Sequence, residues 1–288
     1  MRVGVVDIGT NSMRLLITDG DEDVMRLERV TGLGRGVDRT GVLSEEAVAV
    51  SLEALEDYGH LLDEAGVARR KAIATSASRD ARNREQFFDA VEDVVGVRPT
   101  LIGGDEEARF AYAGATQHFP APEPVLVSDI GGGSTEFVTA GEAVSIDIGS
   151  VRLTERALPD RPASPAQLKE AREHVAGLFA GLDFGPVATL IGVAGTWTEI
   201  PVLVRGPGAE RDGAVLTSTE VTAVVERLAG LRVDETAAIP GFNPGRAPVI
   251  LGGVVVAEAV LRTLGMSEVT ISIRDTMDGV AATLLALP

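Results

Sequence analysis

The chain of 288 residues contains no cysteine and only two lysines among its 26 basic residues. Without cysteine, disulfide bonds, thiolate nucleophiles and cysteine-based zinc sites are all excluded. The three histidines, His60, His118 and His174, lack the spacing of metal ligands. Basic residues are also outnumbered by 43 acidic ones, which gives a net charge of −17. A protein that coats nucleic acid through a basic surface is therefore excluded.

Long hydrophobic runs are absent as well. The longest run, residues 247–257, is about half the length that a membrane span needs. Near the N-terminus, Asp7 interrupts the apolar residues before they reach the length of a signal peptide. The sequence thus predicts a soluble cytoplasmic protein with no membrane partner. Its length, about twice that of a typical domain, predicts two domains.

Short apolar strands alternate with helical segments along the chain, a pattern that predicts an α/β fold. Three prolines within residues 119–124 allow neither a helix nor a strand, so we expect the domain boundary there, between residues 1–120 and 121–288. Strands are expected at residues 3–8, 15–18, 24–30, 71–75, 100–102, 125–130, 136–139, 144–148, 187–191 and 269–273. Helices are expected at residues 44–64, 79–95, 106–117, 165–182, 196–204, 218–231, 249–264 and 276–287.

An internal repeat links the two halves. The pattern D-I-G-x-x-S occurs at residues 7–12 and again at residues 129–134, each time directly after an apolar strand. Strand-to-strand turns favour Asp and Gly in general, so two short matches alone leave chance open. Taken with the strand pattern, they indicate that the chain is duplicated.

Both repeated turns have the composition of a phosphate-binding loop. Glycine lets the backbone approach a ligand and lets successive amides point at an anion, and hydroxyl groups add further donors. A plain glycine-rich hairpin is the alternative for residues 131–133. Asp7 and Asp129, at the strand ends, would hold a magnesium ion that bridges to phosphate oxygens. The expected phosphate-binding residues are Thr10, Asn11, Ser12, Gly131, Gly132, Gly133, Ser134 and Thr135.

Six strings, in order along nearly the whole chain, resemble the exopolyphosphatase/guanosine pentaphosphate phosphohydrolase family of the actin-like ATPase superfamily. The resemblance implies two similar ribonuclease H-like domains with the active site in the cleft between them, and a final helix, 276–288, that returns to the first domain. The chain is similar to the short two-domain form of the family. The matching strings are residues 7–15, 74–83, 104–109, 129–136, 149–154 and 192–196.

The same resemblance implies a role for each matching residue. Glu107 is expected to orient the attacking water, with Glu106 as the alternative, and Asp129, Glu136 and Asp7 to hold Mg²⁺, or Mn²⁺ in its place. Arginines that could extend a basic track toward the substrate are Arg14, Arg35, Arg109 and Arg152. The expected substrate-binding residues are Arg79, Asn83, Arg14, Arg152, Gly195 and Thr196. The chain departs from the family pattern at Gly32, Pro248 and Ile273, which puts substrate contacts in doubt.

The resemblance implies an exopolyphosphatase that removes terminal phosphates from inorganic polyphosphate by in-line attack of water, and it is compatible with a homodimer. One alternative is the same chemistry on the 5′-phosphate of guanosine pentaphosphate. Another is a nucleotide-binding switch without hydrolysis, in which residues 192–196 would cradle adenosine. A sugar kinase is the weakest alternative, since no acceptor-binding aspartate pattern is evident. A P-loop NTPase is excluded because no G-x-x-x-x-G-K-[ST] string exists.

Overall fold

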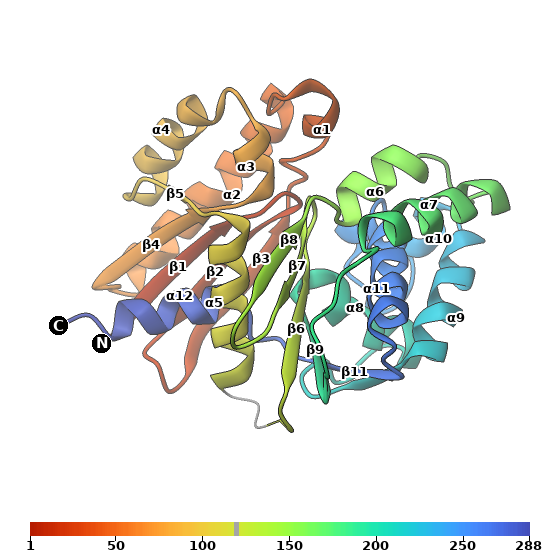
Figure 1. Cartoon of the computed structure of the whole chain (residues 1–288). Helices are drawn as coiled ribbons and strands as arrows, with labels where there is room; N and C mark the ends of the chain where they lie inside the picture. The colour runs from red at the N-terminus through yellow and green to blue at the C-terminus, as the bar shows by residue number, and fades with distance from the viewer. Residues whose placement is uncertain (118–120) are drawn as a thin grey trace. The chain divides into compact units, whose positions relative to one another are not determined.

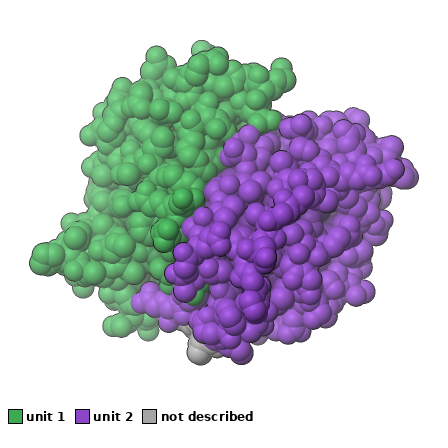
Figure 2. All heavy atoms as spheres, viewed as in Figure 1, with its two compact units in different colours: residues 1–114, 276–288 green, residues 115–275 purple. Residues whose placement is uncertain are grey.

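The computed structural model describes residues 1–117 and 121–288 (Figure 1). It divides into two compact units, which Figure 2 colours separately. Unit 1 comprises residues 1–114 and 276–288, and unit 2 comprises residues 115–275. The expected domain boundary at residue 120 lies outside the described residues, whereas the division between the units falls within helix α5 (Gly104–Gln117).

Unit 1 contains a five-stranded sheet in the order β3-β2-β1-β4-β5. Strands β1, β2 and β3 form an antiparallel meander, and β4 and β5 continue the sheet in parallel with β1. The strands are β1 (Val3–Ile8), β2 (Ser12–Thr18), β3 (Asp23–Val30), β4 (Arg69–Ala74) and β5 (Thr100–Leu101). Besides α5, the helices are α1 (Val37–Thr40), α2 (Glu45–Glu64), α3 (Ser76–Asp80), α4 (Arg84–Val95) and α12 (Thr276–Leu285).

Unit 2 repeats this plan in a six-stranded sheet, β10-β11-β9-β6-β7-β8. Its meander is β6 (Val125–Ile130), β7 (Thr135–Val138) and β8 (Ala143–Ile146), and β9 (Thr189–Val193) lies parallel to β6. Strands β10 (Val215–Thr217) and β11 (Glu268–Ile271) complete the sheet. The helices are α6 (Ser150–Ala157), α7 (Pro165–Leu178), α8 (Ala194–Arg205), α9 (Ser218–Ala229), α10 (Val233–Ala237), the 3₁₀ helix η1 (Pro244–Arg246) and α11 (Ile250–Leu264). The predicted α/β fold of two similar halves is thus confirmed.

Strand β1 is buried on both faces of its sheet. Val6 and Ile8 pack into the core beneath α2 and α4, whereas Val3 and Val5 pack into a second core with α12. Successive residues of a strand point to opposite faces, so a strand covered on both sides must be apolar throughout. This is the continuous apolar run that the sequence shows at residues 3–8.

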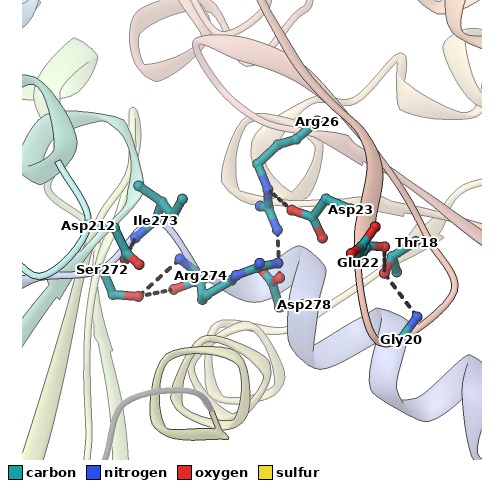
Figure 3. Close-up of polar contacts among 10 residues, drawn as sticks. All are labelled: Thr18, Gly20, Glu22, Asp23, Arg26, Asp212, Ser272, Ile273, Arg274 and Asp278. Atoms are coloured by element: carbon teal, nitrogen blue, oxygen red, sulfur yellow. Dashed lines mark hydrogen bonds and ion pairs between the residues drawn. The ribbon is translucent and has the colours of Figure 1, made fainter. Parts of the chain in front are cut away.

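Helix α12 is fixed to unit 1 by polar contacts at both of its ends. Near its start, the Arg26 guanidinium donates to Asp278 at 2.5 Å while also bonding Asp23 at 3.0 Å (Figure 3). Near its end, Arg69 Nη1 donates to the carbonyls of Leu284 and Leu287 at 3.1 and 2.8 Å. Side-chain cations that bind the last carbonyls of a helix stabilise it.

In unit 2, the segment that follows β11 is also held by hydrogen bonds. The Ile273 amide donates to Asp212 at 3.0 Å, and the Ser272 hydroxyl forms a tight turn with the backbone of Arg274 (Figure 3). These bonds fix the chain immediately before it enters α12.

The structure corrects two expectations about helices. The helix predicted at residues 79–95 is interrupted, because Ala81 is extended and the Asn83 side chain bonds both the amide and the carbonyl of Leu43, at 2.9 and 3.0 Å. Helix α6, which the sequence analysis missed, follows Gly149 and docks against the turn between β6 and β7. Among the described residues, no helix has the length and apolar character needed to cross a membrane.

Tyr58 connects α2 to the strand that follows the first repeated turn. Its hydroxyl donates to the Met13 carbonyl at 3.0 Å, and its side chain is buried. Burial raises the pKa of Tyr58 to about 12, whereas tyrosine in an unfolded chain titrates near 10. Between these values only the unfolded chain ionises, so the free energy of unfolding falls as the pH rises.

We therefore expect the wild-type protein to lose roughly 2 kcal/mol of unfolding free energy between about pH 10 and pH 12 through Tyr58. Tyr58→Phe lacks this ionisation and should lose correspondingly less. At neutral pH the variant should be less stable by about 1 kcal/mol, because the hydrogen bond to Met13 is lost. Urea unfolding at several pH values measures both effects. Parallel pH curves for the two proteins would show that Tyr58 ionises equally in the folded and unfolded chains.

Candidate functional site

The first repeated turn, residues 9–12, joins β1 to β2 in unit 1. It is closed by a hydrogen bond of 3.0 Å from the Gly9 amide to the Ser12 carbonyl. Among the described residues, no group accepts a hydrogen bond from the amides of Thr10 and Asn11. The Asn11 side chain is buried, yet no described residue forms a hydrogen bond with its Nδ2 or Oδ1 atom. Buried polar groups of this kind are rare unless they serve a ligand or water.

The second repeated turn, residues 131–134, joins β6 to β7 in unit 2 and has the same geometry. The Gly131 amide donates to the Ser134 carbonyl, again at 3.0 Å. No acceptor within the described part of the chain faces the amides of Gly132 and Gly133. The repeat predicted from six letters of sequence is therefore a repeated backbone conformation, with two uncovered amides in each copy.

Both turns are held from the carbonyl side by the segment that follows the third strand of the meander. In unit 1, the amides of residues 31, 32 and 34 donate to the carbonyls of Asn11 and Thr10, at 2.7–3.0 Å. In unit 2, the first amides of α6 donate to Gly131 and Gly132 at 2.8–3.2 Å, and Arg152 Nε donates to Gly133 at 2.9 Å. In a trans peptide the carbonyl and the amide point in opposite directions. Each bound carbonyl therefore directs the amide of the next residue to the other side: the Asn11 amide in the first turn, and the Gly132 and Gly133 amides in the second.

Helix α3 connects the first turn to two charged residues of unit 1. The Ala77 amide donates to the Thr10 hydroxyl oxygen at 3.1 Å, and two residues later Arg79 Nη1 donates to Glu107 Oε2 at 2.9 Å and to the Ile102 carbonyl at 3.0 Å. The Glu107 side chain is 13% exposed, whereas Glu106 is exposed to solvent. Unit 1 thus brings together the predicted base and a predicted substrate-binding arginine.

The electrostatic surroundings of Glu107 act in opposite directions. Burial raises the pKa of the Glu107 carboxyl, and the charge and hydrogen bond of Arg79 oppose this effect. The charges of Asp7 and Arg14, at the first turn, also influence Glu107. A carboxylate whose pKa is raised is a stronger proton acceptor when it is ionised. Perturbed carboxyl groups of this kind are concentrated at functional sites.

Asp7 and Arg14 face each other across β1 and β2, and Arg14 Nε donates to Asp7 Oδ2 at 2.8 Å. On the next strand, Glu28 is the register partner of Arg14 and accepts a hydrogen bond of 2.7 Å from the Ser12 hydroxyl. Glu28 is not among the residues predicted from motifs. The strand register could have identified it, because residues that pair across a hairpin share one face.

The carboxylates of unit 2 form a buried pair. Asp129 and Glu136 are register partners on β6 and β7, with 4% and 0% exposure, and Ser145 donates to Glu136 Oε1 at 2.8 Å. Within the described ranges, no three acidic or histidine side chains gather into a metal-binding cluster. Asp7, the third predicted ligand, lies on β1 of unit 1, and its part in the metal site stays a prediction. Mg²⁺ typically takes one or two carboxylates together with water and substrate phosphates, so the pair fits this ion.

Several predicted site residues have internal partners instead. The Thr135 hydroxyl donates to the Ile148 carbonyl at 2.6 Å. The Ser12 hydroxyl donates to Glu28, and the Asn83 side-chain amide is bonded to the backbone of Leu43. Arg152 Nε braces the second turn. These four side chains thus have protein partners, and their predicted contacts with phosphate or substrate stay predictions.

The junction of β9 and α8 holds the predicted Gly195 and Thr196. Thr196 is buried, and a methyl group placed on Gly195 would lie 1.8 Å from Arg246 Nη2. The Arg246 guanidinium, itself only 7% exposed, therefore lies directly on Gly195. Gly192 is covered in the same way by the Trp197 indole, 2.7 Å from its added methyl position. The sequence analysis assigned no role to Arg246, since nothing in the local pattern shows what it contacts.

Comparison with known proteins places the chain in a family. The profile of the Ppx/GppA phosphatase family matches residues 16–286. Exopolyphosphatase 2 of Mycobacterium tuberculosis is 37% identical, and the alignment covers 98% of each chain. The crystal structure of an exopolyphosphatase-like protein has a TM-score of 0.93 at 34% identity, over 99% of this chain and 98% of that one.

A second solved structure, the Ppx/GppA family member of Aquifex aeolicus, has a TM-score of 0.82 at 30% identity, and also covers 99% of this chain and 98% of that chain. The family match begins at residue 16, after the first repeated turn, and includes the second turn. The two structural matches each cover 99% of the chain. With this sequence coverage and fold, the chain belongs to the Ppx/GppA phosphatase family.

Proposed function

We propose that this protein is an exopolyphosphatase, which hydrolyses the terminal phosphate of inorganic polyphosphate. The observation that carries the proposal is the pair of equivalent turns, each with two adjacent amides that no group in the described part of the chain covers. Such amides bind phosphate oxygens without bringing a bulky side chain between ligand and backbone. The names of the relatives support the same substrate class, because Exopolyphosphatase 2 is similar over nearly its whole length.

Glu107 is the proposed general base. Water attacks the terminal phosphorus while Glu107 accepts a proton from it, and the bond from that phosphorus to the bridging oxygen breaks. The products are orthophosphate and a chain shortened by one phosphate. Most of the catalysis in such a reaction comes from positioning and from neutralising the charge on the phosphoryl oxygens. Arg79 holds the Glu107 carboxylate at 2.9 Å and so fixes the direction of its free lone pairs.

Asp129 and Glu136 would hold the magnesium ion. When bound, this ion neutralises charge on the phosphate oxygens. The pair is buried on adjacent strands directly beside the second turn, which leaves most coordination positions for water and phosphate.

The packing at the junction of β9 and α8 argues against the nucleotide-binding switch. Adenosine at residues 192–196 would need open space over Gly192 and Gly195, and these glycines are covered by Trp197 and Arg246. Cleavage of guanosine pentaphosphate uses the same groups on a phosphate chain. Phosphate release from both substrates, measured side by side with magnesium, distinguishes the two activities. Release from neither substrate would contradict the proposed function.

The base can be tested with neighbouring glutamates. Glu107→Gln should lower kcat for polyphosphate by about 100-fold or more, as is typical when a general base is lost. Glu106→Gln should change kcat by less than about twofold, because Glu106 is exposed. Equal effects of the two substitutions in a phosphate-release assay would argue against Glu107 as the base.

The role of Arg79 predicts a change in pH dependence. Its charge opposes the raised pKa of Glu107, so Arg79→Met should raise that pKa further. Since the base acts only when ionised, the acidic limb of the kcat/KM profile should move to higher pH, and Arg79→Lys should move it less. If Arg79→Met lowered the rate equally at every pH, Arg79 would act on the substrate alone.

The close packing behind the second turn gives a third test. A methyl group on Gly149 would lie 2.6 Å from the Gly132 carbonyl, whereas one on Gly141, in the same unit, would meet nothing within 4 Å. Gly149→Ala should therefore displace the turn and lower kcat/KM by about tenfold or more, which is typical of a displacement of about 1 Å in such a site. Gly141→Ala is the matched control and should retain wild-type activity. Wild-type kinetics for Gly149→Ala would show that the turn tolerates displacement.

A further inference from the structure

Most cations of unit 1 are already engaged by protein groups. Arg14, Arg26, Arg79 and Arg98, for example, are bonded to carboxylates. Arg35 differs, because in the described part of the chain no hydrogen bond or ion pair involves its exposed side chain. In a protein with a net charge of −17, a cation without a carboxylate partner keeps its full charge available to an external anion.

Arg35 lies in the segment that braces the first turn. A methyl group on Gly32 would be 2.5 Å from Arg35 Nε and 2.9 Å from Cζ, so the guanidinium lies against the Gly32 backbone. The Gly32 amide in turn donates to the Asn11 carbonyl at 2.9 Å. The positive φ of Gly32, 68°, is readily adopted by glycine, and any side chain there would collide with the guanidinium. The Arg35 guanidinium therefore packs on a residue that is hydrogen-bonded directly to the first turn.

A guanidinium suits the ligand that these amides would bind. It remains charged at all physiological pH values and presents several N–H donors in a planar fork that matches two phosphate oxygens. The turn offers donors for one phosphate group, and a phosphate chain places further charges next to that group. A ligand with a single phosphate has no second phosphate group for Arg35 to bind.

We propose that Arg35 is a specificity-determining residue that binds the phosphate chain beyond the group held by the first turn. This inference rests on the proposed function and adds a contact that favours long phosphate chains. Since the contact is distant from the reacting bond, it should stabilise the ground state and the transition state alike. Such uniform binding lowers KM and leaves kcat unchanged.

The test compares Arg35→Ala with Arg39→Ala, using long-chain polyphosphate and tripolyphosphate as substrates. Arg39 is the matched control, because it is also exposed and free of side-chain bonds among the described residues, and lies four positions further along. Arg35→Ala should raise KM for long chains by about tenfold, as expected for one charged hydrogen-bonded contact. Its kcat should change by less than twofold, and Arg39→Ala should change neither constant by more than twofold. Arg35→Lys should recover part of the affinity.

Equal KM values for the two alanine variants would overturn the inference, as would a loss of kcat at unchanged KM. Thermal unfolding of Arg35→Ala checks that the loop remains folded, and Arg35→Gln provides a second variant that keeps the packing on Gly32. If the wild-type protein released no phosphate, the proposed function would fail separately. Calorimetric binding of polyphosphate to wild type and to Arg35→Ala would then decide the inference, with equal affinity or no binding to either protein contradicting it.

Discussion

The structure depends on the orientation of four peptide groups. In each repeated turn, a hydrogen bond closes the turn across its first and fourth residues, and a following segment binds the carbonyls between them. Two amides in each turn are left without an acceptor among the residues that the structure describes. A buried or half-buried amide without an acceptor costs free energy. The molecule retains this cost in both halves, which is the pattern expected when a ligand supplies the missing acceptors.

The acidic composition of the protein limits how it can attract a polyanion. A chain with a net charge of −17 would repel a polyanion over most of its surface, so attraction must be local. In the proposed function, backbone amides, a magnesium ion that Asp129 and Glu136 would hold, and arginines without carboxylate partners would supply it. Arg79 is not one of these, since its charge is shared with Glu107. The ion pairs of unit 1 therefore distinguish two groups of cations. Cations bonded to carboxylates, such as Arg79, are proposed to position the base, and cations without such a bond are proposed to contact the ligand.

Local signals in the sequence predicted the fold well, and long-range contacts account for most of the differences. The strand at residues 3–8 has the predicted bounds because its uninterrupted apolar residues must be buried on both faces. The helix expected at residues 79–95 is interrupted because Asn83 binds Leu43, 40 residues away in the chain. Periodicity cannot show such a contact. For the same reason α6, which forms against the glycine turn, left no recognisable signal.

The candidate site was predicted in part. The two turns and the pair of Glu107 with Arg79 follow from motifs, and motifs record residue types at fixed spacing. They do not record hydrogen-bond partners, so the protein contacts of Ser12, Thr135 and Asn83 could not be predicted from the sequence. Charge alone likewise could not separate Arg152, which braces a turn, from Arg35, which has no bonded partner among the described residues. Glu28 and Arg246 required the strand register and the packing of Gly195.

The central claim is that the uncovered amides of the turns bind phosphate groups. Amide NMR spectra of the 30.0 kDa protein, recorded during titration with tripolyphosphate and magnesium, test it most directly. The account predicts that the resonances of Thr10, Asn11, Gly132 and Gly133 shift the most and saturate together with binding. Unchanged resonances at these four amides, with the largest shifts elsewhere in the chain, would contradict it.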